Sequence, residues 1–264
     1  MLRRWQRAQR VERLFWNSEQ TVQAETQTIL ERYSATFQEI RPDRKCRVLD
    51  VGCGPTLVSR MVEGGEKYCI DPLMNHLLEK TQGRSMSASF HFLMGAGEYL
   101  PFLDGCFDRL VCRNVLDHVL CPEEVLKEMK RVSKSSAIVV LGAYVYSEFV
   151  ARLKKDLERF GIILLKDEYH PHFFTERTFE RLCSGQFSIV KRKTVYYDRA
   201  TWIGIQGKTF VAQDQQEREK RSRSYWTLAV CASVAVTLFW NIVRLLNRAK
   251  ASYFMSEYAL IACR

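Results

Sequence analysis

Residues 48–55 read Val-Leu-Asp-Val-Gly-Cys-Gly-Pro, an apolar strand that runs directly into a Gly-x-Gly turn. Further short apolar runs alternate with helical stretches along the chain, which is typical of a mostly parallel sheet covered by helices on both faces. The expected strands are 47–51, 67–70, 90–94, 109–112, 137–141, 187–196 and 258–263, and the clearest helices are 122–133 and 175–183. The sequence therefore predicts an α/β fold with a doubly wound, seven-stranded, mostly parallel sheet.

The composition limits the kinds of partner. The chain has 264 residues, of which 47% are apolar, so it can bury a sizeable core, and its formal net charge is +10. A basic balance favours anionic partners such as nucleic acid, anionic lipid headgroups or an acidic substrate. Nine cysteines without a C-x-x-C pair indicate reduced thiols in a cytosol-facing compartment. Five histidines without repeated ligand spacing do not indicate a metal site, and nothing indicates an oligomeric state.

The glycine turn is a candidate ligand site. In open α/β sheets, ligands bind at the carboxyl ends of strands, where glycines let the backbone approach them. Such a turn also occurs without a ligand, so the neighbouring residues matter. Asp50 places a carboxylate at the mouth of the turn, where it would repel a pyrophosphate and disfavours a dinucleotide. Asp71 ends the next strand and can accept hydrogen bonds from both ribose hydroxyls of an adenosine.

With segment 97–111, these stretches resemble the class I methyltransferases, specifically the group that includes the quinone-biosynthesis methyltransferases. The resemblance covers roughly residues 46–136 and implies a Rossmann-like fold with S-adenosyl-L-methionine as cofactor. It implies that the loop Asp50–Gly54 wraps the methionine moiety, that Asp71 binds the ribose and that the turn 95–98 flanks the adenine. The family usually has an acidic or amide residue where this chain has Ala96-Gly97. The expected cofactor-binding residues are Asp50, Gly52, Cys53, Gly54, Asp71, Pro72, Gly97, Glu98, Asn114 and Val115.

The acceptor of the methyl group should lie after the fourth strand. Family geometry puts Asn114 beside the sulfonium and His118 at the mouth of the cleft, where its imidazole could accept a proton. His118 could equally be a packed histidine at a helix start, with Asp117 as the cap of that helix. His172 lies in 170–174, which resembles the family's substrate lid or else forms a surface loop leading to a helix capped by Thr175. We therefore predict His118, Asn114 and His172 as catalytic residues.

A charge-free run at 225–243 has the length of a membrane-spanning helix, with Trp226 and Trp240 near its ends and basic residues on both sides. The family places its last strand, here 258–263, inside the sheet, antiparallel between the fifth and sixth strands. One crossing would leave that strand on the wrong side of the membrane. We therefore expect 225–243 to contact a membrane surface from one side, with a true span and a buried or dimer-forming helix as alternatives.

These observations predict four parts. An N-terminal helical cap spans 1–45, the methyltransferase domain 46–212, a basic and hydrophobic membrane-associated insertion, helical in its apolar part, 213–252, and the final strand 253–264. The expected location is membrane-associated and facing the cytosol; an arginine-rich start leaves a mitochondrial location as an alternative.

The expected function is S-adenosylmethionine-dependent methylation of a small, hydrophobic or membrane-resident acceptor. A nucleic-acid or protein methyltransferase is an alternative that the basic charge supports, although the signature of amino-group methylation on bases is missing after the fourth strand. A membrane-associated, non-catalytic scaffold is the other alternative, motivated by Ala96-Gly97.

Overall fold

The computed structural model describes most of the chain. The described residues are 2–38, 40, 45–80, 88–148, 151–152, 155, 170–198 and 255–264. Its helices are α1 (Leu2–Phe15), α2 (Glu19–Gln38), the short 3-10 helix η1 (Val58–Met61), α3 (Met74–Lys80), α4 (Pro122–Val132) and α6 (Glu176–Ser184). Its strands are β1 (Arg47–Val51), β2 (Glu66–Asp71), β3 (Phe90–Met94), β4 (Phe107–Arg113), β5 (Ser133–Tyr146), β6 (Phe174–Thr175), β7 (Ser188–Asp198) and β8 (Met255–Cys263).

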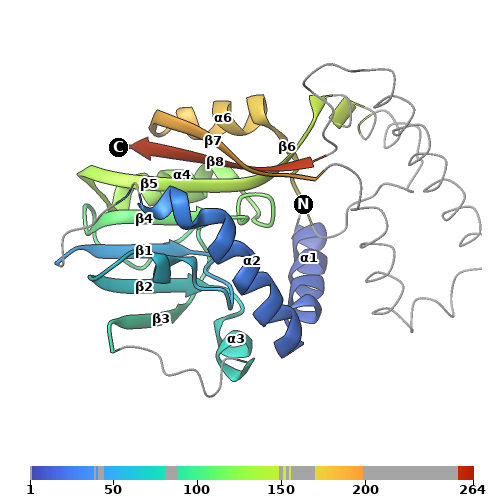
Figure 1. Ribbon diagram of the computed structural model, residues 1–264, viewed down its shortest axis with the longest axis horizontal. Helices are drawn as coiled ribbons and strands as arrows, with labels where there is room; N and C mark the ends of the chain where they lie inside the picture. The colour runs from blue at the N-terminus through green and yellow to red at the C-terminus, as the bar shows by residue number, and fades with distance from the viewer. Residues whose placement is uncertain are drawn as a thin grey trace, which may run out of the picture. The chain divides into compact units, whose positions relative to one another are not determined.

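The strands form one sheet in the order β3-β2-β1-β4-β5-β8-β7, and the short β6 pairs with β5 outside this path (Figure 1). Pairs β1–β2, β1–β4, β2–β3 and β4–β5 are parallel. The last strand, β8, lies between β5 and β7 and runs opposite to β5 in Figure 1. The doubly wound, mostly parallel sheet expected from the sequence is therefore confirmed, including the place of its last strand.

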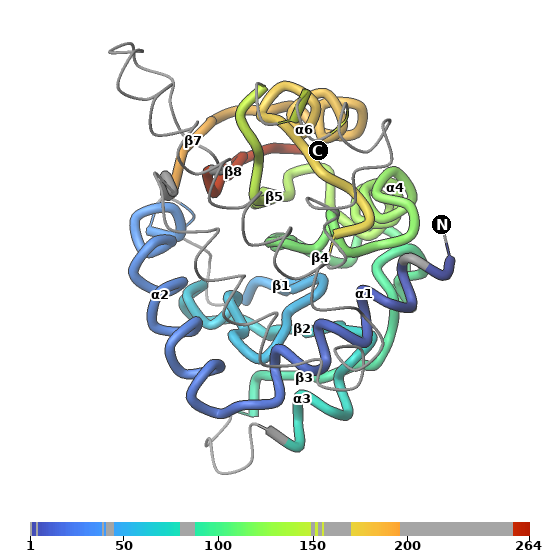
Figure 2. Tube along the Cα trace, turned by 90° about the vertical axis from the view of Figure 1, so that its right-hand side faces the viewer, coloured from blue at the N-terminus to red at the C-terminus, as the bar shows by residue number. Residues whose placement is uncertain are grey.

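Alternating side chains of the central strands build two cores, one on each face of the sheet. Leu49, Leu110 and Val139 pack on one face with Val125 and Met129 of α4. Figure 2 shows α2 on the opposite side of the sheet from α4 and α6. The second core holds the intervening strand residues with three residues of α2: Val48, Val111, Val140, Ile29, Tyr33 and Phe37. This two-residue alternation explains why the strands read as unbroken apolar runs.

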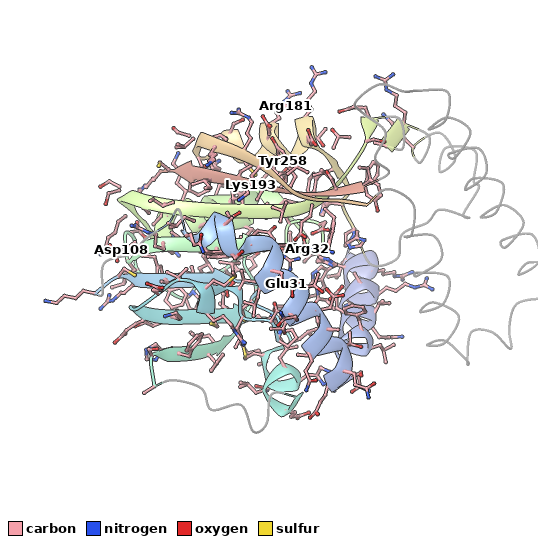
Figure 3. The ribbon with its side chains drawn as sticks, viewed as in Figure 1. Glu31, Arg32, Asp108, Arg181, Lys193 and Tyr258 are labelled. Atoms are coloured by element: carbon pink, nitrogen blue, oxygen red, sulfur yellow. The ribbon has the colours of Figure 1, made fainter. Side chains whose placement is uncertain are left out.

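A buried ion pair network joins α2 to the middle of the sheet. The carboxylate of Glu257 on β8 is fully buried and lies 2.5 Å from Nη2 of Arg113 on β4. Nη1 of Arg32, labelled on α2 in Figure 3, lies 3.2 Å from the other Glu257 oxygen and donates to the Tyr144 hydroxyl. Burial lowers the pKa of Arg113, but the nearby Glu257 raises it more, so the net shift is upward and the guanidinium stays charged. Helix α2 is thus joined to strand β8 by an ion pair.

The chain divides into two compact units. The first comprises 1–145, 167–196 and 257–264, and the second comprises 146–166 and 197–256. The second unit includes few described residues, and the expected insertion 213–252 with its apolar run 225–243 lies outside them. Within the described ranges, no helix combines the length and apolarity that crossing a bilayer requires.

Candidate functional site

The turn after β1 has the open backbone that the sequence suggests. Gly52 and Gly54 both have positive φ angles, 63° and 52°, which glycine adopts without strain. A Cβ atom on Gly52 would lie 2.3 Å from Cγ2 of Val115, so the backbone here approaches the segment after β4 very closely. A Cβ on Gly54 would meet no atom within 4 Å, so the turn opens onto free space on that side. Cys53, between them, is buried.

Asp50 stabilises the turn by a hydrogen bond to the segment that follows it. Its Oδ2 accepts the backbone N–H of Ser59 at 3.0 Å, at the start of η1. The carboxyl group is buried, and burial raises its pKa to about 6 despite that hydrogen bond. At least one oxygen of Asp50 therefore fixes the chain around the turn.

Asp71 ends β2 beside the same turn. Its Oδ2 accepts the N–H of Gly54 at 3.1 Å, and its Oδ1 accepts the N–H of Leu73 at 2.8 Å. Burial raises its pKa to about 6, although both amides favour the charged form. An ionised carboxylate has about four acceptor positions, so Asp71 keeps capacity for two more donors. Pro72 follows it and is partly exposed.

Asn114 stands at the end of β4 in a left-handed conformation, with φ 52°. Its backbone N–H donates to Gly142 O at 2.8 Å, which fixes the turn out of the strand. Its side-chain oxygen is buried and accepts no hydrogen bond from the described residues. A buried carbonyl oxygen without a donor is costly, so Asn114 presents an acceptor suited to a ligand.

The turn after β3 contacts β1, α4 and the loop before α4. A Cβ on Gly97 would lie 3.0 Å from Val51 and 3.1 Å from Val125, so this glycine allows close packing against β1 and α4. Oε1 of Glu98 accepts the backbone N–H groups of Leu120 and Cys121, just before α4. The carboxylate of Glu98 thus fixes the α4 entry loop, and its predicted contact with the cofactor stays a prediction.

Three side chains with metal-ligand or acid–base character meet next to Asn114. Asp117 Oδ2 lies 3.8 Å from His118 Nε2 and 3.7 Å from His170 Nε2. The two imidazole centroids are 4.5 Å apart. Asp117 is buried, and among the described residues its Oδ1 has no hydrogen-bond partner. We call Asp117, His118 and His170 the Asp-His-His cluster.

The cluster belongs to the same site as the glycine turn. The neighbouring residue Val115 packs on Gly52. Glu12 of α1 and His118 are close enough to Asp71 that Glu12 contributes to the rise of its pKa and His118 opposes it. The acceptor-side and cofactor-side residues predicted from the sequence therefore lie together at the carboxyl ends of β1, β2 and β4.

Two expectations, about Asp117 before α4 and about His172 before β6, need correction or reassignment. Asp117 is not a helix cap, because α4 begins only at Pro122 with Cys121 as its N-cap. His172 donates its backbone N–H to Asp117 O at 3.2 Å, and its Nε2 lies 3.0 Å from Val119 O. These contacts fasten the 170–173 loop to the 117–119 loop, while a catalytic part for His172 stays a prediction. The capping of α6 by Thr175 is confirmed.

Sequence reasoning missed Glu12 and the pairing of His170 with Asp117. Oε1 of Glu12 lies 3.5 Å from His118 Nδ1, and its Oε2 accepts the Trp16 indole N–H at 2.9 Å. A single glutamate among the arginines of the first helix was the only signal in the sequence. The spacing of the histidines carried no signal, because the chain fold alone brings 117–118 and 170 together.

Comparison with known proteins supports the sequence interpretation. Residues 49–141 match the family described as "Methyltransferase domain". The human thiol S-methyltransferase TMT1A is 30% identical over 161 residues, which cover 57% of this chain and 63% of that protein. An uncharacterized methyltransferase of Schizosaccharomyces pombe is 32% identical over 105 residues, which cover 35% of this chain and 38% of that protein. The matched part thus spans less than two thirds of either relative.

Solved structures share the fold. The cyclase SpnF superposes with a TM-score of 0.59 at 17% identity, covering 88% of this chain and 80% of SpnF. The geranyl diphosphate C-methyltransferase of Streptomyces coelicolor, solved with S-adenosyl-L-homocysteine, superposes with a TM-score of 0.55 at 10% identity, covering 93% and 83%. At these identities the superpositions establish the fold of the sheet and its helices.

Proposed function

We propose, from the premise that this chain is a class I S-adenosylmethionine-dependent methyltransferase, that it transfers a methyl group to the thiol of a small molecule. The observation that carries the proposal is the position of the Asp-His-His cluster beside an open glycine turn with a free acceptor at Asn114. The similarity to human thiol S-methyltransferases supports a thiol among the possible acceptors.

The residues around the turn fit S-adenosylmethionine. The space in front of Gly54 admits the methionine part without a Cβ in the way. Asp71 has acceptor capacity for the two ribose hydroxyls. The buried oxygen of Asn114 can accept from the ammonium group or face the sulfonium charge. When bound, the cofactor supplies an electrophilic methyl group, and the protein's task is to hold the acceptor in line with it.

A thiol acceptor needs its proton removed, because the thiolate is the nucleophile. Free thiols have pKa values near 8.5, so a group that takes or displaces the proton raises the reactive fraction at neutral pH. The Asp-His-His cluster is the group of side chains placed for this task. Its two imidazoles and one carboxylate lie next to Asn114 and Val115, where the resemblance puts the reacting atoms.

Methyl transfer from labelled S-adenosylmethionine tests this function. Purified full-length protein in mild detergent should methylate aliphatic thiols at least tenfold faster than the matching alcohols or amines. His118→Gln should lower the rate with thiols by about 10²-fold or more, since it removes one member of the cluster. His91→Ala removes a histidine that pairs with Glu66 on the sheet and should leave the rate unchanged. Equal rates for thiol and alcohol acceptors, or label in an RNA fraction instead, would refute the thiol assignment.

We further propose that 225–243 attaches the protein to the cytosolic face of a membrane from one side. Strands β7 and β8 are neighbours in the sheet, so the segment that joins them starts and finishes at the same domain. Nineteen residues are too few for two crossings at about 20 residues each. The basic residues flanking this run, Lys220, Arg221 and Arg223, would favour anionic lipid.

Vesicle flotation checks the attachment. The full chain should float with vesicles that contain anionic lipid, and replacing the three basic residues with glutamine should weaken vesicle binding by about 10²-fold, at about 1 kcal/mol for each charge. Flotation that is independent of lipid charge, or absent with all vesicles, would contradict the proposal.

A further inference from the structure

The Asp-His-His cluster has the donor set and spacing of a metal site. The three candidate ligand atoms, one from each side chain, all lie within 4.8 Å of one another. Two donors that bind one zinc ion at about 2.0–2.1 Å can be at most about 4.2 Å apart. The two pairs that include the Asp117 oxygen, at 3.8 and 3.7 Å, already satisfy this limit. The histidine pair needs a movement of at most about 0.6 Å, which a ring rotation provides.

Unsatisfied polar atoms point to an occupant. Asp117 is only 3% exposed, and its Oδ1 accepts no hydrogen bond from the described residues. The Nδ1 atom of His118 is also buried without an aligned hydrogen bond, but it faces Glu12 and not the space beside Asp117. A buried carboxylate is expensive unless it is paired or coordinates a metal. A cation held between Asp117 and the two imidazoles would remove that cost.

Glu12 is placed to orient one ligand. His118 faces Asp117 with Nε2 and Glu12 with Nδ1, the latter at 3.5 Å. Histidines that bind metals through one ring nitrogen generally donate the other N–H to a carboxylate, which fixes the tautomer and the ring. Glu12 is itself held by the Trp16 indole at 2.9 Å. Helix α1 therefore supplies the support that such a histidine needs.

Contacts of His172 hold in place the loop that carries the third ligand, His170. The backbone N–H of His172 donates to Asp117 O, and its Nε2 lies 3.0 Å from Val119 O. These two contacts keep residue 170 beside residues 117–118. The site therefore has its ligands on two connected loops, with one ligand oriented from a helix.

We propose that the Asp-His-His cluster binds one divalent transition-metal ion of the zinc class. Two imidazoles and a carboxylate are a zinc donor set, and three protein ligands leave a fourth position for an exogenous ligand. Methyl transfer involves no electron transfer, which suits a redox-inactive ion. Glu12 and Asp71 add negative charge near the cluster, which attracts a cation.

The fourth ligand is the acceptor sulfur, an identification that rests on the proposed function. The thiol replaces a bound water and binds as the thiolate, and its proton passes to solvent water. The sulfur then uses an electron pair to form the bond to the methyl carbon, while the bond between that carbon and the sulfonium breaks and its electrons stay on the cofactor sulfur. The products are a methyl thioether and S-adenosylhomocysteine.

Direct metal binding tests the site without relying on turnover. Full-length protein is stripped with a chelator and titrated with zinc by calorimetry, with elemental analysis of the dialysed complex. We expect one equivalent of zinc, and at least tenfold weaker binding in each of Asp117→Asn, His118→Gln and His170→Gln. His91→Ala is the matched control and should bind like the unaltered protein. S-adenosylmethionine binding, measured in the same samples without metal, reports whether each variant is folded.

Three outcomes decide the proposal. Loss of the zinc equivalent in the three variants, with cofactor binding retained, supports it. Absence of stoichiometric zinc, or zinc that survives all three substitutions because cysteines hold it, overturns it. Cobalt(II) in place of zinc reports the fourth ligand, because a small thiol should change its visible spectrum as sulfur binds. A zinc site with that spectral change but no methylation of any thiol would overturn the proposed function and leave the metal site standing.

Discussion

Replacing Asp71 with asparagine should make the cofactor-free protein more stable and the cofactor bind more weakly. Burial raises the pKa of Asp71 to about 6 from an ordinary value of 3.8, so the folded protein disfavours the ionised form. A shift of this size corresponds to about 3 kcal/mol of lost stability above pH 6, and asparagine carries no charge to bury. Asparagine cannot accept hydrogen bonds with both side-chain atoms, so it loses one amide contact, about 1 kcal/mol at every pH.

The pH dependence separates these two effects. A carboxyl group whose folded-state pKa is raised costs nothing well below pH 3.8, and its cost grows until the pH passes 6, where it is complete. The gain in free energy of unfolding of Asp71→Asn over the unaltered protein should therefore be larger at pH 8 than at pH 5 by about 1.4 kcal/mol. The hydrogen-bond loss does not affect this difference, because it is the same at both pH values.

Urea unfolding at pH 5 and pH 8, each without cofactor, measures that difference. Calorimetry at pH 8 measures cofactor binding, and the affinity should fall by about 10²- to 10⁴-fold, since two hydrogen bonds to a charged group are lost at about 1.5–3 kcal/mol each. Asp50→Asn, at a residue whose pKa is also raised to about 6, is a second variant for the stability effect. A variant with the same stability advantage at both pH values would refute the claim that Asp71 is desolvated. Unchanged cofactor affinity would refute its place at the ribose.

Other substitutions test neighbouring parts of the structure. Gly52→Ala should destabilise the protein by about 2–4 kcal/mol in urea unfolding, because its Cβ would lie 2.3 Å from Val115 at a positive φ. Gly54→Ala meets no atom and should cost only about 1–2 kcal/mol, yet it should weaken cofactor binding in calorimetry; the reverse order of stabilities would contradict the geometry. Glu257→Gln should lower the free energy of unfolding by about 3–5 kcal/mol, because it removes the buried carboxylate that pairs with Arg113 and with the partly exposed Arg32, and a loss under 1 kcal/mol would show that water or a neighbouring acid replaces it. Glu98→Ala should cost about 2 kcal/mol in thermal or urea unfolding by leaving two amides before α4 without an acceptor, and no change would mean that water replaces the carboxylate.

The sheet was predictable because its strands carry a strong local signal. The predicted bounds of β1 and β3 are those observed, since each is an apolar run ended by glycine or polar residues. The prediction for β5 was too short, 137–141 against Ser133–Tyr146. Its first residues, Ser-Lys-Ser-Ser, have no apolar pattern and become a strand only through pairing of Ser133 with Phe107 of β4. The residue pattern within one segment does not indicate such a pairing with another strand.

The site was predictable only where it depends on one turn of the chain. Gly52 and Asp71 were recognisable from their places at strand ends, and both lie at the carboxyl ends of the neighbouring strands β1 and β2. The Asp-His-His cluster depends on two loops and a helix that are remote in sequence, so neither His170 nor Glu12 could be assigned to it in advance. The start of α4 at Pro122 agrees with the predicted helix 122–133, so the alternative of Asp117 as the cap of a helix starting at His118 was wrong, and Asp117 lies in the loop before α4.

The place of β8 has a consequence for how the protein folds during synthesis. The strand between β5 and β7 is synthesised after both of its neighbours, so β7 cannot join β5 through it until residues 255–263 emerge from the ribosome. Before then, Arg113 and Arg32 have no Glu257 to pair with. Helix α2, although made before every strand, gains its ion pair with β8 only after that strand has entered the sheet. Native packing of β5 and β7 should therefore be completed only after residues 255–263 have emerged, and until then the open edges of these two strands are available to chaperones.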